Sequence, residues 1–309
     1  MDEPGFSLRN ATVAIVGLGL MGGSLALALL SKNACAKIIG IDSNEATRTQ
    51  ALACNVVEEA SDDLSAAARA DVIVIATPAR TIIDLLPRVG TIARENAIII
   101  DLGSTKREIT QAMEALPAHV QPIGGHPMCG KESSGFAAAD ANLFHSATFA
   151  LTPLARTSAA TLAFAQSFAE TIGARPLVID AERHDQIVAA TSHLPYVVAS
   201  ALMATADKIS QDEELLFRLA ASGFRDTSRL AASDPTMMID ILLTNRVNVI
   251  KMLQQYAAQL NELTDLIDRA DAAELRAHLR TIAESRQKSV GTPSPVISSG
   301  ATRSVSDHD

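Results

Sequence analysis

Short apolar runs alternate with segments of helical spacing from residue 11 to about residue 180. The runs are almost continuous in Val, Ile and Ala, which is typical of strands buried on both faces. They are Ala11–Val16, Lys37–Ile41, Asp71–Ala76, Ala97–Asp101, His119–Ile123, Thr148–Thr152 and Ala174–Ile179. Helical spacing marks Ser24–Leu30, Thr81–Ile92 and Arg107–Leu116 between them. The alternation predicts an α/β domain with a doubly wound sheet over residues 1–181.

The pattern changes from Glu182 onward, where strand-like runs disappear and Ala, Leu, Met, Gln and Glu dominate. We therefore predict an all-α domain over residues 182–286. Apolar residues step by three and four along its last part: Val249, Leu253, Tyr256, Leu260, Leu263 and Ile267. Such a seam packs on another helix, either within the chain or across a homodimer interface, and both remain open here. Residues 287–309 are rich in Ser, Thr and Pro and predict a disordered tail.

Three glycines, Gly17, Gly19 and Gly22, form the sequence G-L-G-L-M-G directly after the first strand-like run and before a helical segment. This is the strand–turn–helix context of a dinucleotide-binding turn. The first glycine permits the turn, the second lets backbone approach a pyrophosphate, and the third lets helix and strand pack closely. Leu20 and Met21 would then begin a helix whose N-terminus faces the phosphates. The chain thus predicts a Rossmann-type NAD-binding domain.

An acidic residue, Asp42, ends the second strand-like run and would accept hydrogen bonds from the ribose hydroxyls. Its carboxylate would repel a 2′-phosphate, which favours NAD over NADP. Arg48 lies close enough in sequence to leave some use of NADP open. The simpler interpretation, a glycine-rich turn in an ordinary βα unit, does not account for the agreement of strand, turn, helix and acid.

The composition indicates where in the cell the protein is located and which classes of partner it does not bind. The chain has 309 residues, 48% hydrophobic residues and a net charge of −9, without a conspicuous basic run. This disfavours nucleic acid and anionic membranes as partners. The acidic N-terminus lacks the pattern of a signal peptide, and the three cysteines form no C-x-x-C pair that would suggest a disulfide framework or a metal site. We expect a cytoplasmic protein without a bound metal.

Three segments that follow strand-like runs carry candidate chemistry. Thr77 and Pro78 form a small turn that would pass the nicotinamide, or merely start a helix. Ser104 stands where a helix N-cap would stand, in D-L-G-S-T-K. His126 lies between a glycine pair and a proline, which predicts a constrained loop and a general base at neutral pH. Cys129, three residues on, is better explained as a small buried thiol than as a nucleophile.

The segment H-D-Q-I-V-A-A-T-S-H-L-P-Y predicts a helix interrupted near Pro195. Helical spacing puts four of its residues on one face, with His193 beside them: Asp185, Ala189, Ser192 and Tyr196. This face would border an active site, although a core role for His193 is at least as well supported. Further on, Arg225 and Arg229 could clamp a carboxylate, or form a surface ion pair with Asp226.

Taken together, the motifs resemble the prephenate/arogenate (cyclohexadienyl) dehydrogenases of tyrosine biosynthesis. The resemblance extends from about Val13 to Leu266 and rests on five segments in order: G-L-G-L-M-G-G-S, D-L-G-S-T-K, G-G-H-P-M-C-G-K-E, H-D-Q-I-V-A-A-T-S-H-L-P and G-F-R-D-T-S-R-L-A-A-S-D-P. It implies NAD-dependent oxidative decarboxylation of prephenate to 4-hydroxyphenylpyruvate, or of arogenate to tyrosine.

The same resemblance implies roles for individual residues. His126 matches the histidine that accepts the hydroxyl proton, and Ser104 the serine that orients that hydroxyl. Arg229 matches the arginine that binds a substrate carboxylate. We also expect the substrate site to include Lys131, His193, Tyr196 and Arg225, and the helical domain to join two chains in a homodimer.

Two departures from the family pattern bear on the substrate. Many members carry a second histidine at Tyr196 and a tryptophan at Met238, so the preference between prephenate and arogenate stays open. β-Hydroxyacid dehydrogenases share the glycine pattern, but Lys208 is not followed by the asparagine that their catalysis uses. A catalytically silent NAD sensor would need no proton acceptor such as His126.

Overall fold

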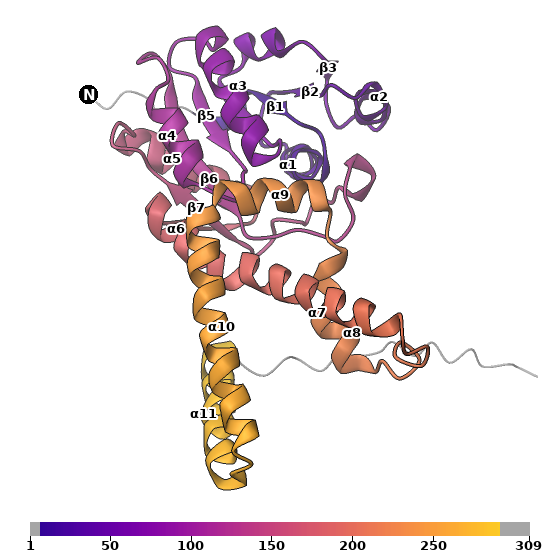
Figure 1. The fold of residues 1–309 in the computed structure, drawn as a ribbon. Helices are drawn as coiled ribbons and strands as arrows, with labels where there is room; N and C mark the ends of the chain where they lie inside the picture. Colours follow the sequence, from indigo (N-terminus) through magenta and orange to yellow (C-terminus); the bar gives the residue numbers. More distant parts are fainter. Residues whose placement is uncertain (1–6, 291–309) are drawn as a thin grey trace, which may run out of the picture. The chain divides into compact units, whose positions relative to one another are not determined.

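The computed structural model describes residues 7–290, and the chain divides into two compact units. The first runs to Leu253 and contains a sheet flanked by helices (Figure 1). The second begins at Gln254, within a long helix, and includes the helix that follows. The helices between residue 181 and Leu253 group with the sheet, so the predicted domain boundary does not coincide with the boundary between these units.

The sheet has eight strands within the described residues, in the order β3-β2-β1-β4-β5-β6-β7-β8. Their bounds are β1 (Thr12–Val16), β2 (Lys37–Ile41), β3 (Glu59–Ser61), β4 (Val72–Ile75), β5 (Ile98–Asp101), β6 (Gln121–Pro127), β7 (Thr148–Thr152) and β8 (Arg175–Val178). Neighbouring strands are parallel except β6 and β7. The strand order reverses between β1 and β4, and loops at the carboxyl ends of such strands form the binding crevice of doubly wound sheets. The predicted α/β class is confirmed.

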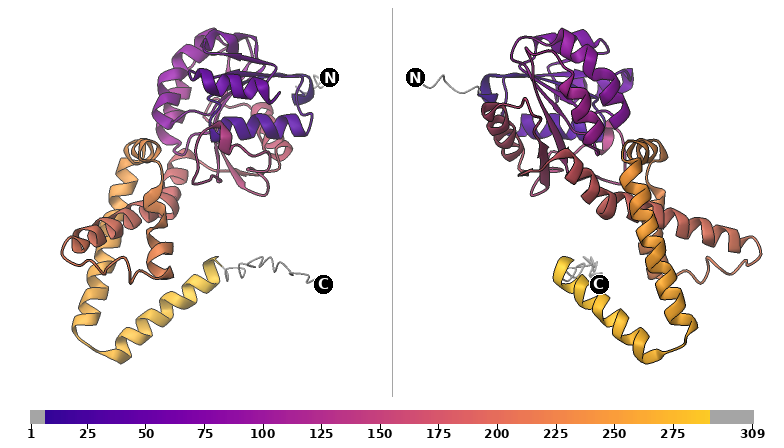
Figure 2. Two further views of the ribbon diagram at one scale, coloured as in Figure 1. Left: turned by 90° about the vertical axis from the view of Figure 1, so that its right-hand side faces the viewer. Right: turned by 60° about the vertical axis from the view of Figure 1, so that its left-hand side comes forward.

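Helices cover both faces of the sheet (Figure 2). The helices of the described residues are α1 (Leu20–Ser31), α2 (Glu45–Ala53), α3 (Ala79–Ile92), α4 (Arg107–Glu114), α5 (Ala159–Thr171), α6 (Ala181–Val188), α7 (Leu194–Ser210), α8 (Ser222–Ser228), α9 (Pro235–Thr244), α10 (Arg246–Asp268) and α11 (Ala272–Val290), and those from α7 onward lie outside the two layers on the sheet. Within β1, Val13 and Ile15 belong to one buried cluster and Ala14 and Val16 to another. This period of two explains the apolar runs, because each face of the strand meets helices. Four short 3-10 turns complete the described part: η1 (Leu8–Asn10), η2 (Leu64–Arg69), η3 (Phe136–Ala138) and η5 (Arg229–Ala232).

The segment G-G-H-P lies on β6 and not on a loop, so that expectation was wrong. The strand continues past Ile123 and pairs antiparallel with β7, with His126 opposite Ala150. Glycine is unfavourable in strands, which is why the segment has the sequence of a turn. Here the close approach of neighbouring backbone requires glycine, since a Cβ on Gly125 would lie 2.7 Å from the carbonyl oxygen of Asp101.

The helical run after the sheet, residues 181–210, is one helix whose predicted interruption is a π-helical turn, η4 (Ala189–His193), just before Pro195. Proline cannot donate to the preceding turn, and a π turn accommodates that loss. The wider turn shifts the register, so His193 is buried and Ser192 is exposed. The prediction that Ser192 shares a face with Asp185 and Ala189, which are buried, was therefore wrong.

The same run is apolar and long enough to cross a membrane by length and composition, with 22% of its most apolar window buried. Three polar residues within it, His184, Asp185 and His193, are buried and hydrogen-bonded to other parts of the first unit. These contacts indicate that it is a helix of the folded protein rather than a membrane span.

The second unit contains the end of α10 together with α11. On the predicted seam, Leu260 and Ile267 are 46% and 63% exposed, whereas the neighbouring Leu266 is buried. The seam is therefore only partly covered within one chain. α11 continues to Val290, beyond the predicted start of the disordered tail at residue 287. The remainder of that predicted tail, residues 291–309, lies outside the described residues.

Candidate active site

The glycine turn after β1 has the geometry that its sequence predicts. Gly17 has a φ of +92°, and a Cβ on Gly22 would lie 1.8 Å from the carbonyl oxygen of Gly17. A Cβ on Gly19 would meet no atom within 4 Å. Gly19 therefore leaves open space at the N-terminus of α1, which begins with Leu20 and Met21. These are the requirements for a phosphate-binding turn.

The acid at the end of β2 is held rigidly. The Asp42 carboxylate accepts hydrogen bonds from the backbone N–H groups of Leu18 and Asn44, both at 2.8 Å. The Arg48 guanidinium donates to the carbonyl oxygens of Asp42 and Ser43 at 2.7 and 3.0 Å. Arg48 is thus engaged with backbone, and the hydrogen bond from Leu18 holds the Asp42 carboxylate beside the glycine turn, where an acid disfavours a 2′-phosphate.

The turn after β4 contains an unpaired polar atom. The Thr77 hydroxyl is buried and has no hydrogen-bond partner among the described residues. Its methyl group would lie 2.9 Å from a Cβ placed on Gly17, so the turn that holds Thr77 and Pro78 lies against the glycine turn. The Asp240 carboxylate of α9 accepts from the backbone N–H of Arg80 at 3.0 Å and so caps the start of α3.

A buried ion pair joins the end of β5 to the start of α4. The Lys106 ammonium contacts the Asp101 carboxylate, and both side chains are fully buried. Lys106 also donates to the carbonyl oxygen of Gly125 at 2.6 Å, and the Gly125 N–H donates to Asp101 at 3.0 Å. The pair therefore fixes the backbone next to His126. Burial lowers the pKa of Lys106, and the Asp101 carboxylate opposes that shift.

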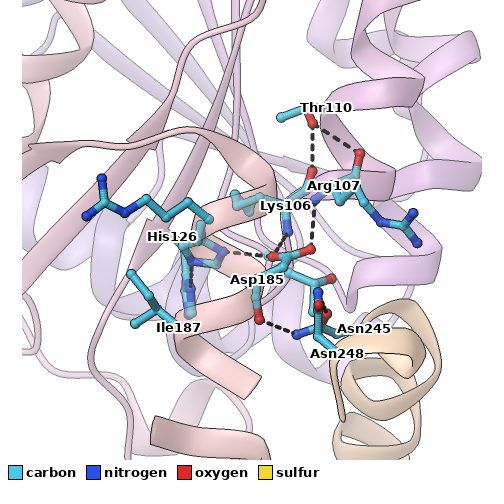
Figure 3. A network of polar contacts seen from close by, with 12 residues as sticks. Lys106, Arg107, Thr110, His126, Asp185, Ile187, Asn245 and Asn248 are labelled. Atoms are coloured by element: carbon cyan, nitrogen blue, oxygen red, sulfur yellow. Dashed lines mark hydrogen bonds and ion pairs between the residues drawn. The ribbon is translucent and has the colours of Figure 1, made fainter. Parts of the chain in front are cut away.

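The imidazole of His126 is joined to two residues of α6. Its Nδ1 lies 2.9 Å from Nε2 of His184, and Nδ1 of His184 lies 2.8 Å from the Asp185 carboxylate. Asp185 also accepts from the backbone N–H groups of Lys106 and Arg107, at 2.7 and 3.0 Å (Figure 3). Asp185 thus caps α4, and the expectation that Ser104 is the N-cap was wrong. Ser104 is half-buried, two residues before the cap position.

Burial lowers the pKa of His126 well below its usual value, and positive charge on His184, Lys106 and His193 acts in the same direction. The ring is therefore neutral near pH 7, the state that a general base requires. No hydrogen bond from a described residue reaches its Nε2.

The side-chain amide of Asn245 forms hydrogen bonds that link Asp185 to its neighbours. The Asn245 amide donates to the backbone carbonyl of Asp185 at 2.7 Å, lies 3.2 Å from Nδ1 of His193, and accepts from Asn248. Burial lowers the pKa of His193 to about 4. The side chain of His193 is only 1% exposed, which agrees with the alternative that it is a core histidine. Its role in substrate binding stays a prediction.

The other predicted substrate residues lie on the surface of the first unit. Arg229 pairs with Glu132, which follows β6, and not with Asp226. Lys131 pairs with Asp140 at 2.9 Å. The Arg225 guanidinium donates to the carbonyl oxygen of Ala220, and Tyr196 is half-buried on α7. The structure brings Arg229 to the loop after His126, whereas it shows no direct contact of Lys131, Arg225 or Tyr196 with His126.

Lys106 and His184 were not identified from the sequence as residues that hold His126 in place. Asp185 was named as part of a helix face but was given no role. An acid on the apolar face of a helix was the available signal for Asp185. Lysine is rarely buried, so nothing in the sequence predicted the burial of Lys106.

Comparisons with known proteins agree with this geometry. Residues 25–178 match the family described as prephenate dehydrogenase, nucleotide-binding domain, and residues 180–281 match the prephenate dehydrogenase dimerization domain. The chain is 32% identical over 278 residues to prephenate dehydrogenase of Bacillus subtilis, covering 89% of this chain and 75% of that protein. It is 32% identical to cyclohexadienyl dehydrogenase of Zymomonas mobilis, covering 89% and 94% respectively.

Solved structures give the same relationship. Prephenate dehydrogenase of Aquifex aeolicus, in complex with hydroxyphenyl propionate and NAD+, has a TM-score of 0.85 and 32% identity over 90% of this chain and 97% of that chain. Arogenate dehydrogenase of Synechocystis has a TM-score of 0.78 and 33% identity over 90% and 99%. A 3-hydroxyisobutyrate dehydrogenase of Salmonella typhimurium, at 16% identity and a TM-score of 0.56, shares only the fold. The chain belongs to the prephenate dehydrogenase family.

Proposed function

We propose that this protein catalyses the NAD-dependent oxidative decarboxylation of prephenate to 4-hydroxyphenylpyruvate, a step of tyrosine biosynthesis. The observation that carries the proposal is His126: its Nδ1 is engaged by His184, while its Nε2 is left for a substrate proton. It stands at the end of β6, next to the carboxyl end of β5, where doubly wound enzymes bind their ligands.

The residues present fit NAD. The open space at Gly19, the N-terminus of α1 and the Asp42 carboxylate suit the pyrophosphate and the ribose. The unpaired Thr77 hydroxyl and Pro78 would border the nicotinamide. NAD, when bound, accepts the hydride. The engagement of Arg48 with backbone carbonyls argues against the NADP use that the sequence left open.

The chain's own residues then have three tasks. Ser104 would orient the ring hydroxyl of prephenate, and Nε2 of His126 would accept its proton as the carbon is oxidised. Loss of carbon dioxide leaves an aromatic ring, which makes the reaction effectively irreversible. A positioned histidine base contributes about 10²–10⁴-fold in rate.

Arg229 would bind a carboxylate of the substrate. Because it pairs with Glu132 in this structure, a substrate carboxylate must displace Glu132. Tyr196, His193, Lys131 and Arg225 would complete the substrate site. We propose that Tyr196 tolerates the keto-acid side chain of prephenate, so that prephenate is preferred to arogenate.

We also propose that the protein is a cytoplasmic homodimer, joined through its helical region, that binds neither nucleic acid nor membranes. The support is the match to a dimerization domain and the exposure of apolar side chains such as Leu219 in the first unit and Ile267 in the second, at 80% and 63%. Light scattering should then give twice the chain mass of 32.5 kDa.

The variant His126→Asn tests the assignment of the base. We expect kcat with prephenate and NAD to fall by about 10²–10⁴-fold while the Kd for NAD stays unchanged. The matched control is His145→Asn, because His145 is exposed. Equal turnover by both variants would remove His126 from the mechanism.

A further inference from the structure

The contacts of His126 determine which of its nitrogens carries the proton. Asp185 accepts two backbone N–H groups and faces Nδ1 of His184, so it acts as a carboxylate acceptor. Nδ1 of His184 must therefore be the donor in that contact. Neutral His184 then presents a lone pair at Nε2, and Nδ1 of His126 must donate to it. With both imidazoles neutral, this is the one arrangement in which both contacts are hydrogen bonds, and it leaves Nε2 of His126 without a proton.

Burial and nearby positive charge hold the pKa of His126 low, so an imidazolium at His126 needs negative charge behind it. His184, Lys106 and His193 act on its charge directly, whereas Asp185 is linked to it through His184, and Asp101 pairs with Lys106 and holds the backbone of Gly125. Asp101, Asp185 and Lys106 are each fully buried. With the histidines neutral, two carboxylates and one ammonium leave one negative charge in excess. Protonation of His126 neutralises this excess, and buried charges require such compensation.

We infer that His184 and Asp185 are positioning residues for His126. They hold a proton on Nδ1 so that Nε2 is the base, and they stabilise the imidazolium that forms when Nε2 accepts the substrate proton. In that step the substrate O–H bond breaks and an Nε2–H bond forms, while the Nδ1–H of His126 stays hydrogen-bonded to His184. The inference rests on the proposed function and adds two residues to it.

Asp185 has a second, purely structural contact that the test must separate, since it caps α4 through Lys106 and Arg107. A loss of that cap would lower the stability of the fold without any effect on the proton of His126. The first variant is therefore His184→Phe, which removes the acceptor for His126, keeps a ring of similar size and leaves Asp185 on α4. His184→Gln retains a side-chain oxygen as acceptor. Glu182→Gln, on the exposed face of the same helix, is the control.

Two measurements decide the matter. In steady-state assays with prephenate and NAD, we expect His184→Phe to lower kcat by about 10²-fold or more with little change in KM, since a misplaced proton costs up to about 10⁴-fold in a related arrangement. His184→Gln should recover part of that loss. In nitrogen NMR of the protein labelled at histidine, without ligands, Nδ1 of His126 should be protonated in the control and should lose this preference in His184→Phe.

A third variant adds a pH profile. Asp185→Asn removes the negative charge behind the pair, so the acid limb of kcat/KM should move to lower pH. If Asp185→Asn does not fold, His184→Phe decides alone. The inference is overturned if His184→Phe keeps kcat within threefold of the control, or if kcat falls while the His126 nitrogens are unchanged. Absence of turnover by the unaltered protein would instead overturn the proposed function, and the NMR experiment would still test the proton position.

Discussion

Two glycines of the nucleotide turn should respond in opposite ways to the same substitution. In Gly22→Ala the new Cβ would lie 1.8 Å from the carbonyl oxygen of Gly17, where ordinary contact begins near 3.4 Å. The backbone must yield by the difference, 3.4 minus 1.8, or about 1.6 Å. In Gly19→Ala the Cβ meets no protein atom within 4 Å.

The magnitudes follow from these distances. Overpacking costs about 1–3 kcal/mol, and we expect the upper end for Gly22→Ala because the opposing atom is backbone. For a domain of this size about 3 kcal/mol corresponds to a Tm lower by about 6–12 °C. Gly19→Ala should cost less than about 1 kcal/mol, the range of a weakened N-cap. Its methyl group would stand where the pyrophosphate approaches, so the Kd for NAD should rise by about tenfold or more.

Thermal unfolding followed by circular dichroism gives Tm, and calorimetric titration of the protein with NAD gives Kd. The reasoning would be refuted if Gly19→Ala bound NAD as tightly as the unaltered protein. It would equally fail if Gly22→Ala kept both its Tm and its affinity.

Three further predictions concern charge. Glu132→Gln should free Arg229 and lower the KM for prephenate severalfold, measured by steady-state kinetics; an unchanged KM would show that the pair does not compete with substrate. Because burial lowers the pKa of His193 to about 4, the unfolded chain binds its proton first as pH falls below about 6.5. Stability should therefore fall between pH 6.5 and 4, by at most about 1.4 kcal/mol per unit from this residue, and urea unfolding of His193→Gln should show a shallower decline. Asp42→Ser should weaken NAD binding without creating strong NADP binding, because Arg48 stays bound to backbone; a Kd for NADP below that for NAD would contradict this.

The sequence was sufficient for seven of the eight described strands and for the nucleotide turn, because both depend on local patterns, but it missed the short strand β3. Apolar runs marked β1, β2, β4 and β5 to within a residue or two. It was insufficient for the extension of β6, where neighbouring strands and not local preference determine the conformation of Gly125 and His126. Strand propensity is governed by such neighbours.

The candidate site was predictable only where single residues carry the chemistry. His126 was identified by its type and its neighbours. The residues behind it were not, because His184, Asp185 and Lys106 come together only when α6 packs against the start of α4. The π turn is also the reason why α-helical spacing gave the wrong face for Ser192. The wider turn shifts the register by one residue, so that His193 is buried and Ser192 is exposed.

The central claim is the reaction itself, and product stoichiometry tests it most directly. Purified protein would be incubated with prephenate and NAD, and separately with arogenate, while reduced nicotinamide, carbon dioxide and the aromatic product are measured. The account predicts equal amounts of NADH, carbon dioxide and 4-hydroxyphenylpyruvate from prephenate, formed faster than tyrosine is formed from arogenate. Faster turnover of arogenate would contradict the proposed preference set by Tyr196, and no turnover of either substrate would contradict the proposed function.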